Sequence, residues 1–139
     1  MEYKIVIGAK DGKSYQKEIK DAEADALHNK YLGDTVSGDS LGYRGYEFLI
    51  TGGSDKSGFP MRKGIQAPRK KVMVGKSVGC CGKDRNNKKR KGLFTKKTVC
   101  GERITKIIRQ VNLKVVKEGP QPLGGAPGEG TAAEAGEKA

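Results

Sequence analysis

Basic side chains are concentrated in one stretch of this chain, and this stretch limits what the chain can fold into. Residues 56–117 carry 20 basic and 2 acidic side chains, whereas residues 1–55 carry 7 and 10, and residues 118–139 carry 1 and 4. Because unpaired charges are costly to bury, we expect the first 55 residues to build most of the folded body. The basic stretch then remains as a surface for a polyanion.

The rest of the composition predicts a modest core in a single domain. Only 35% of the 139 residues are apolar, there is no Trp, and 32% are charged, against roughly 25% charged in an average soluble domain. The sequence has no run of about 18 apolar residues, and no charged-then-apolar leader follows Met1. We therefore expect a soluble cytoplasmic protein that does not contact membranes and whose three cysteines stay reduced.

The last 22 residues differ from the rest of the chain. Residues 118–139 contain 6 Gly, 3 Pro and 5 Ala, and Leu123 is their only large apolar side chain. Such a segment cannot offset its own ordering entropy by burial. The sequence predicts a flexible Gly/Pro/Ala-rich tail at 118–139 and a folded body at 1–117.

Strand patterns dominate the body. Alternating apolar and polar residues at 3–7 and 15–19, separated by Asp11-Gly12, predict an opening β-hairpin. Further strands are predicted at 46–51, 71–74 and 111–117, the last of them closing a barrel.

Two short helical segments are also expected. One is a helix from Asp21 to Lys30, and the other is a helical turn at residues 104–111, where Ile104, Ile107 and Ile108 recur at helical spacing. The fold class is therefore mainly β: a small β-barrel of about six strands with one or two short helices and long basic loops.

The sequence offers little for catalysis or metal binding. His28 has no nucleophile or carboxylate cluster around it, which is typical of a surface residue. Cys80, Cys81 and Cys100 match no zinc-site spacing. Residues 8–14 look like a phosphate-binding loop, but three residues separate the glycines where the pattern needs four. We predict a protein that is not an enzyme, with no metal, cofactor or small-molecule substrate.

The densest basic run lies between Gly79 and Lys97, where Asp84 is the only acidic residue among eight basic ones. Self-repulsion should keep this run extended until a polyanion neutralises it. A second basic cluster surrounds Pro60 and Pro68, which should hold it as a fixed array suited to structured RNA. The residues predicted to bind RNA are Lys56, Arg62, Lys63, Arg69, Lys70, Lys71, Lys83, Arg85, Lys88, Lys89, Arg90, Lys91, Lys96 and Lys97.

Other features of the basic stretch favour RNA over DNA. Nothing in it resembles a DNA recognition helix, a zipper or a zinc finger. Phe59 and Phe94 lie inside it and can stack on bases, although Phe59 could equally pack under its own turn.

A glycine-rich motif follows the predicted strand at 46–51 and reads LITGGSDKSGFPMR over residues 49–62. The strand should stop at Gly52-Gly53, where glycine permits positive φ or the close approach of another chain. Asp55 should then hold the turn through nearby backbone N–H groups. The residues assigned to this structural turn are Gly52, Gly53, Asp55, Gly58 and Pro60.

Further features flank the motif in a fixed order. These are Gly33-Asp34, Val36, Gly38-Asp39, Leu41-Gly42 and Gly45-Tyr46 before it, and Pro68-Arg69, the basic run and residues 111–117 after it. Together, over about residues 1–117, they closely resemble the small-subunit ribosomal protein "S six e" family, shared by archaeal and eukaryotic ribosomes.

The resemblance implies a structural, ribosome-associated protein with a small β-barrel body. Its partners would be small-subunit ribosomal RNA and neighbouring ribosomal proteins. Eukaryotic members carry a long helical C-terminal extension with regulatory phosphorylation sites; this chain lacks it, so it looks archaeal and no signalling role is implied. The chain departs from the family at residues 79–82 and 99–101, where more basic or aromatic residues are expected, and at Asn86-Asn87, which interrupts the basic run.

Two other functions remain as alternatives. A free RNA chaperone, or another nucleic-acid-binding protein outside the ribosome, would need the same charge; competition between ribosomal RNA fragments and duplex DNA at one salt concentration separates it. An enzyme would need Cys80, Cys81 or His28 at its site, and alanine replacements test that.

Overall fold

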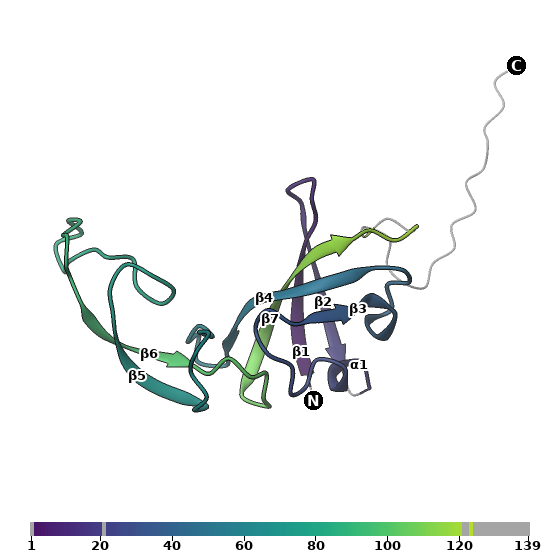
Figure 1. The fold of residues 1–139 in the computed structure, drawn as a ribbon, viewed down its shortest axis with the longest axis horizontal. Coiled ribbons are helices and arrows are strands. Elements are labelled where there is room, and N and C mark those ends of the chain that lie inside the picture. The colour runs from purple at the N-terminus through teal and green to yellow at the C-terminus, as the bar shows by residue number, and fades with distance from the viewer. Residues whose placement is uncertain (1, 21, 121–122, 124–139) are drawn as a thin grey trace, which may run out of the picture.

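The computed structural model describes residues 2–20, 22–120 and 123, and within them it contains seven strands and two short helical segments (Figure 1). The strands are β1 (Glu2–Gly8), β2 (Ser14–Lys20), β3 (Thr35–Ser37), β4 (Glu47–Asp55), β5 (Arg69–Val74), β6 (Thr95–Cys100) and β7 (Ile108–Lys117). The helical segments are α1 (Ala22–Asp25) and the 3-10 helix η1 (Gly38–Leu41). The predicted mainly-β fold is confirmed.

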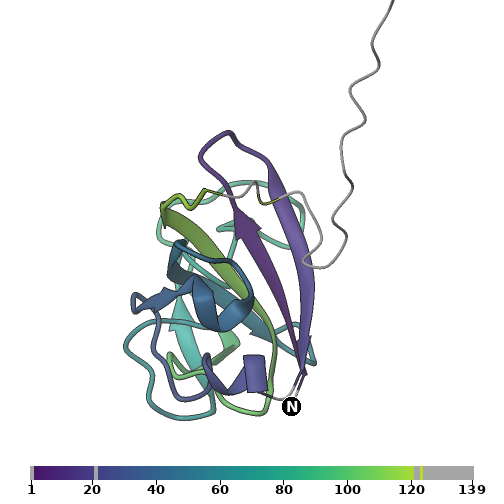
Figure 2. The same cartoon turned by 90° about the vertical axis from the view of Figure 1, so that its right-hand side faces the viewer.

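Five strands form one sheet in the order β2-β1-β7-β4-β3, and this sheet curls into a half-barrel (Figure 2). β1 pairs antiparallel with β2 and parallel with β7, which in turn pairs antiparallel with β4. The strand expected to close a barrel, β7, therefore lies at the centre of the sheet. Its alternating Val111, Leu113 and Val115 are at most 2% exposed because they face the core, whereas Val116 on the other face is 49% exposed.

The hydrophobic core gathers on one face of this sheet. Ile5 and Ile7 of β1 join Phe48 and Ile50 of β4, all of them at most 1% exposed. The Tyr46 ring stacks on Phe48 with 5.7 Å between centroids. Alternation in the sequence predicted β1 and β2, and the largely apolar stretch at 46–51 predicted β4, because one side of each strand packs into this core.

The helix predicted from Asp21 to Lys30 is much shorter in the structure. Only Ala22–Asp25 is helical, and turns follow. Asn29 takes a positive φ of 65° and donates its N–H to the carbonyl of Ile104 at 3.0 Å, so a tertiary hydrogen bond replaces the helical one. His28, expected on the surface, is half-buried, and its Nδ1 lies 3.2 Å from the Tyr3 hydroxyl.

The helical turn predicted at residues 104–111 is also wrong. Ile104 is fully buried and donates its N–H to the Lys30 carbonyl at 2.8 Å, whereas Ile107 is 37% exposed. A turn closed by Ile108 N–H and the Thr105 carbonyl, 3.0 Å apart, leads directly into β7. The isoleucine spacing resembled a helix, but the backbone of Ile104 bonds to a distant segment.

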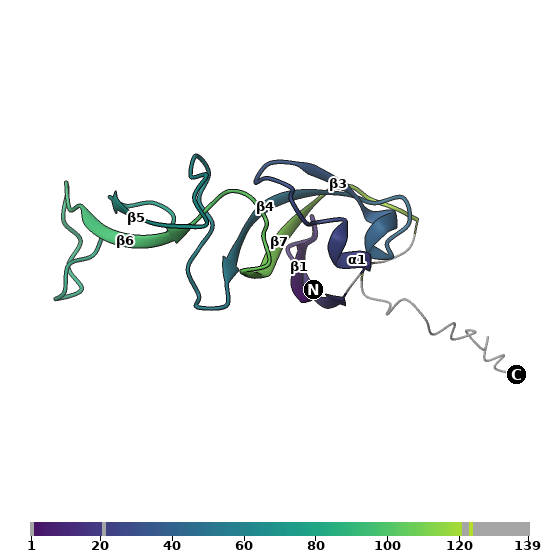
Figure 3. The same cartoon turned by 90° about the horizontal axis from the view of Figure 1, so that it is seen from below.

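β5 and β6 form a separate antiparallel hairpin that extends away from the half-barrel (Figures 1 and 3). The sequence predicted β5 but not β6, because Lys96 and Lys97 placed the start of β6 within the basic run. We call residues 56–103 the arm, and residues 2–55 with 104–120 the body.

The start of the predicted tail contacts the body. Gly119 packs so closely on Arg44 and Tyr46 that a Cβ there would overlap both. Leu123 is partly buried against the core cluster. The flexible-tail prediction for residues 121–122 and 124–139 lies outside the described residues.

Candidate nucleic-acid interface

All fourteen residues predicted to bind RNA lie on the arm. Thirteen of them are exposed, and Arg62 is half-buried. The arm has 16 basic and 2 acidic side chains, whereas the body has 11 of each. The basic excess of the chain is therefore confined to the arm, and the four basic residues of residues 104–117 belong to a body that is neutral as a whole.

The arm is attached to the body at Asp55, the last residue of β4. Its side chain is buried, and Oδ1 accepts the backbone N–H groups of Ser57 and Phe59, each at 2.8 Å. Oδ2 accepts one hydrogen bond from Nε of Arg69 at 2.7 Å and another from the Cys100 thiol at 3.2 Å. One carboxylate thus connects β4 and its turn to the first residue of β5 and the last residue of β6.

The protonation states at this attachment follow from its contacts. Burial alone would raise the pKa of Asp55, but the hydrogen bonds from Phe59, Cys100, Arg69 and Ser57 together bring the pKa below its ordinary value. Burial, reinforced by the hydrogen bond to Asp55 and its charge, raises the pKa of the Cys100 thiol to about 11. At neutral pH, Asp55 is a carboxylate and Cys100 is a thiol donor.

Of the two roles expected for the glycines at 52–53, the structure confirms close approach of another segment at Gly53 and not positive φ, and the strand does not end there. β4 does not stop at Gly52-Gly53 but continues to Asp55, and neither glycine has a positive φ. Gly53 is required by close approach, since a Cβ there would lie 2.5 Å from the Gln110 carbonyl and 2.9 Å from the Met61 sulfur. The turn itself uses Gly58, whose φ is 83°.

The two arginines nearest the attachment have protein partners. Arg69 pairs with Asp55, donates to the Ser57 hydroxyl at 3.1 Å and lies over the Phe59 ring at 5.4 Å. Nη1 of Arg62 donates to the Ser77 hydroxyl at 3.0 Å and to the Val78 carbonyl at 3.3 Å. Phe59 is partly buried against the core cluster, so of its two suggested roles the structure favours packing.

The densest basic run folds into tight turns instead of staying extended. Asp84 donates its N–H to the Lys88 carbonyl at 2.9 Å, and Asn87 takes a φ of 62°. The Asp84 carboxylate accepts the N–H of Arg85 at 2.8 Å and pairs with Arg90 at 3.3 Å. The only acidic residue of the run therefore holds its turn together.

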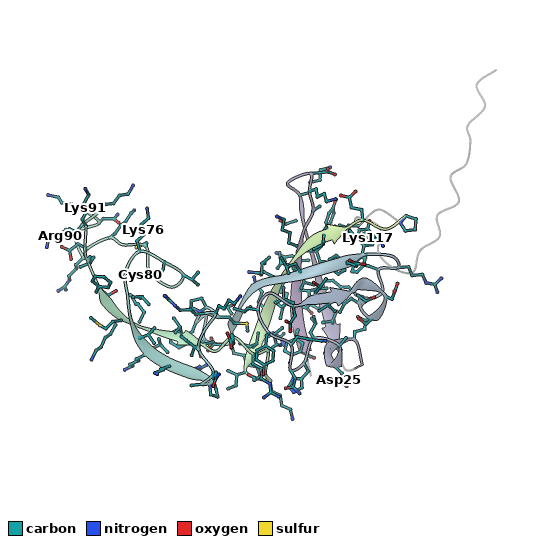
Figure 4. The ribbon with its side chains drawn as sticks, viewed as in Figure 1. Asp25, Lys76, Cys80, Arg90, Lys91 and Lys117 are labelled. Atoms are coloured by element: carbon teal, nitrogen blue, oxygen red, sulfur yellow. The ribbon has the colours of Figure 1, made fainter. Side chains whose placement is uncertain are left out.

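The tip of the arm also carries a basic residue that was not predicted to bind RNA. Figure 4 shows Lys76 near Arg90 and Lys91 at the end farthest from the body. Lys76 and Arg103, both exposed, complete the basic side chains of the arm. No local motif marks either residue; only the charge of the whole arm could have identified them.

The cysteines do not come together. Cys100 is buried at the attachment, Cys81 is exposed, and half-buried Cys80 lies 3.4 Å from the Thr95 hydroxyl. Within the described ranges, no three His, Cys, Asp or Glu side chains are grouped so that they could hold a metal ion. Over the same residues, no helix is long and apolar enough to cross a membrane.

A groove of about 580 Å³ lies where the arm meets the body. Gly52 and Gly53 of β4 line it on one side, and Arg62, Lys63 and Val78 of the arm on the other. The Lys63 side chain is exposed at this groove, so its ammonium group can meet an anion there.

Known proteins resemble the chain over most of its length. The family model described as "Ribosomal protein S6e" matches residues 3–127. The "Small ribosomal subunit protein eS6" of Methanococcus maripaludis strain C6 is 43% identical over 129 residues, which cover 91% of this chain and 97% of that protein. The proteins of the same name from Archaeoglobus fulgidus and Thermoplasma acidophilum are 40% and 38% identical, covering 88% and 86% of this chain and 93% and 91% of theirs.

Proposed function

Because this chain belongs to the ribosomal protein S6e family, we propose that it is a structural component of the small ribosomal subunit that binds ribosomal RNA through its arm. The family assignment agrees with the predictions of an archaeal protein that is not an enzyme. The proposed partners are small-subunit ribosomal RNA and neighbouring ribosomal proteins, and the proposed location is the cytoplasmic ribosome.

The separation of charge between arm and body carries this proposal. Sixteen basic side chains against two acidic ones give the arm a strong positive field, while the body is balanced. Both acidic residues of the arm are used within it, since Asp84 pairs with Arg90 and Glu102 accepts the N–H of Gly64 at 2.8 Å. Little opposes an approaching phosphate backbone, so binding is favoured by the release of its counterions.

The shape of the arm suits a folded RNA. Asp55, Arg69 and Arg62 use their side chains to hold the arm against the body and to hold its loops together. The remaining basic residues then extend from a fixed framework, which reduces the entropy lost when they meet phosphates. We assign to Lys56, Lys63, Lys70, Lys71 and the basic residues from Lys83 to Lys97 the phosphate contacts, and to Arg62 and Arg69 mainly the positioning of the arm.

A charge-matched pair of variants tests the proposal. In one, Lys88, Lys89, Arg90 and Lys91 at the tip are replaced by Gln; in the other, the exposed body residues Lys13, Lys30, Lys106 and Lys114 are replaced by Gln. The quantities measured are co-sedimentation with purified small subunits and affinity for ribosomal RNA fragments over a series of salt concentrations.

We expect the tip variant to bind more weakly and to show a flatter plot of log affinity against log salt, by about 0.7–0.9 for each phosphate that the tip no longer neutralises. The body variant should keep the wild-type slope. Equal slopes in the two variants would contradict binding through the arm, and absence of the wild-type protein from small subunits would contradict the ribosomal role itself.

A further inference from the structure

The β5–β6 hairpin has one face that the rest of the protein leaves open. Met73 pairs with Lys96 and Lys71 pairs with Thr98, so these four side chains lie on one side of the hairpin. On the opposite side, Val74 and Val99 are at most 2% exposed beneath the loop that follows β5, where Gly79 packs on Val99. The apolar side chains of one face, Val74 and Val99, are therefore covered, whereas Met73 on the other face is exposed; we call this second face the bare face.

Two large apolar side chains stand on the bare face. Phe94 directly precedes β6, whose ladder ends at the Val74–Thr95 pair, and extending the register by one residue places Phe94 opposite Gly75. A Cβ on Gly75 would lie 3.3 Å from the Phe94 ring, which agrees with this position. This register places Phe94 on the same face as Met73. They are 62% and 59% exposed, the two highest values among the exposed large hydrophobic residues of the described chain.

The charges around this pair indicate what it can bind. Lys71 and Lys96 are exposed on the same face as Met73 and Phe94. The two acidic residues of the arm lie elsewhere: Asp84 in the tip turn and Glu102 beyond the end of β6. An apolar ring between cations fits a nucleotide, because the base has a flat face that stacks on aromatic side chains and the flanking phosphates are anionic.

We propose that Phe94 and Met73 form a stacking platform for one unpaired RNA base, with Lys71 and Lys96 binding the phosphates beside it. The inference rests on the proposed function and deepens it. Bases inside a regular RNA helix are stacked on their neighbours and are not available to a side chain, so the platform selects a bulge, a loop or a strand end. The rest of the arm binds backbone charge and does not make this distinction.

A double-mutant cycle between protein and RNA tests the platform. The RNA is a hairpin with a single bulged adenosine, and its counterpart has an abasic site at that position with the same backbone. The full-length proteins are wild type, Phe94→Ala, Phe94→Tyr and Tyr31→Ala. Tyr31 is a matched control, because it is an aromatic residue of the body that is 45% exposed.

We expect wild type to bind the bulged hairpin at least about fivefold more tightly than the abasic one. Phe94→Ala should lose this preference while the salt slope stays unchanged, and Phe94→Tyr should keep it. Tyr31→Ala should behave as wild type. Because Phe94 is mostly exposed, Phe94→Ala should fold, and its thermal unfolding should match that of wild type.

Three results would overturn the inference. A bulged-over-abasic preference retained by Phe94→Ala would show that the ring does not contact the base. Normal RNA binding by Phe94→Ala combined with loss from small subunits would show that the face contacts a protein. Wild type that binds the bulged and the abasic hairpin equally would show that there is no platform. All three results leave the proposed function standing, which absence of the wild-type protein from small subunits would contradict.

Discussion

The body and the arm are stabilised in different ways. In the body, the core cluster draws on β1, β2, β4 and β7 and on the segment around α1. In the arm, the buried hydrophobic residues outside that cluster are Val74 and Val99, among the residues that the structure describes. Burial of apolar area therefore accounts for most of the stability of the body and little of that of the arm.

The body and the arm also differ in net charge, and this difference affects how each keeps its shape. A body with 11 basic and 11 acidic side chains has no net charge to oppose compaction, whereas an arm with 16 and 2 repels itself. The arm keeps its shape through its attachment at Asp55, the β5–β6 ladder and the tip turns. The comparison shows that a charged binding element needs few apolar residues when a neighbouring core fixes its base.

The largest expected effect comes from the core of the body. Phe48→Ala should lower the free energy of unfolding by about 3–5 kcal/mol, because it leaves a cavity under the stacked Tyr46 ring. Val74→Ala in the arm should cost less and should leave the backbone amides of the body protected. Denaturant titration combined with hydrogen exchange checks both; equal loss of protection in the body would contradict the division into two regions.

The second largest effect is expected from Asp55, which attaches the arm to the body. Asp55→Ala leaves Arg69 and two backbone N–H groups without their acceptor, which should cost about 2–3 kcal/mol. The cost is below that of a fully buried pair because the Arg69 side chain is 40% exposed. Hydrogen exchange should accelerate in β5 and β6 more than in β1 and β7. The exposed Glu18→Ala serves as the control, and a similar loss of stability there would contradict a special role for Asp55.

Acid should weaken the same attachment. The pKa of Asp55 is lowered in the folded protein from an ordinary 3.8, so its contribution to stability is present above that value and is lost as pH falls through the lowered pKa. Wild type should therefore lose more stability than Asp55→Asn as the pH falls below 3.8. Thermal unfolding across this range measures the difference, and Glu2→Gln, which alters an exposed pair with Arg109, should retain most of the wild-type dependence.

The smallest expected effect is a difference in the rate at which the three cysteines react with iodoacetamide. With its pKa raised to about 11 and its side chain buried, Cys100 should resist iodoacetamide at pH 8 in the folded protein. Cys81 is exposed, and hydrogen bonds from Thr95 and Gly82 lower the pKa of Cys80, so these two should react first. Peptide mass spectrometry reads the order; early modification of Cys100 would mean that the arm detaches readily.

Local patterns predicted the structure well where one side of a strand faces the core. Tyr3, Ile5 and Ile7 alternate in β1, and the Asp11-Gly12 turn joins it to β2 as expected. The strand β6 was not predicted, because Lys96 and Lys97 are adjacent and only Val99 and Cys100 are buried. Few residues of this hairpin are buried, so charged residues occupy positions on both of its faces. The sequence then lacks the alternation of apolar and polar residues on which strand prediction depends.

The amino-acid sequence by itself determined the family, the mainly-β class and the segment that carries the basic charge, because these depend on local composition and pattern. The tertiary structure alone decided that β7, although it lies in the basic stretch, is the central strand of a neutral body. It also decided that Asp55, expected to hold only its own turn, binds Arg69 and Cys100. Both depend on partners between 14 and 45 residues away or in other strands, and such contacts form only when the chain folds.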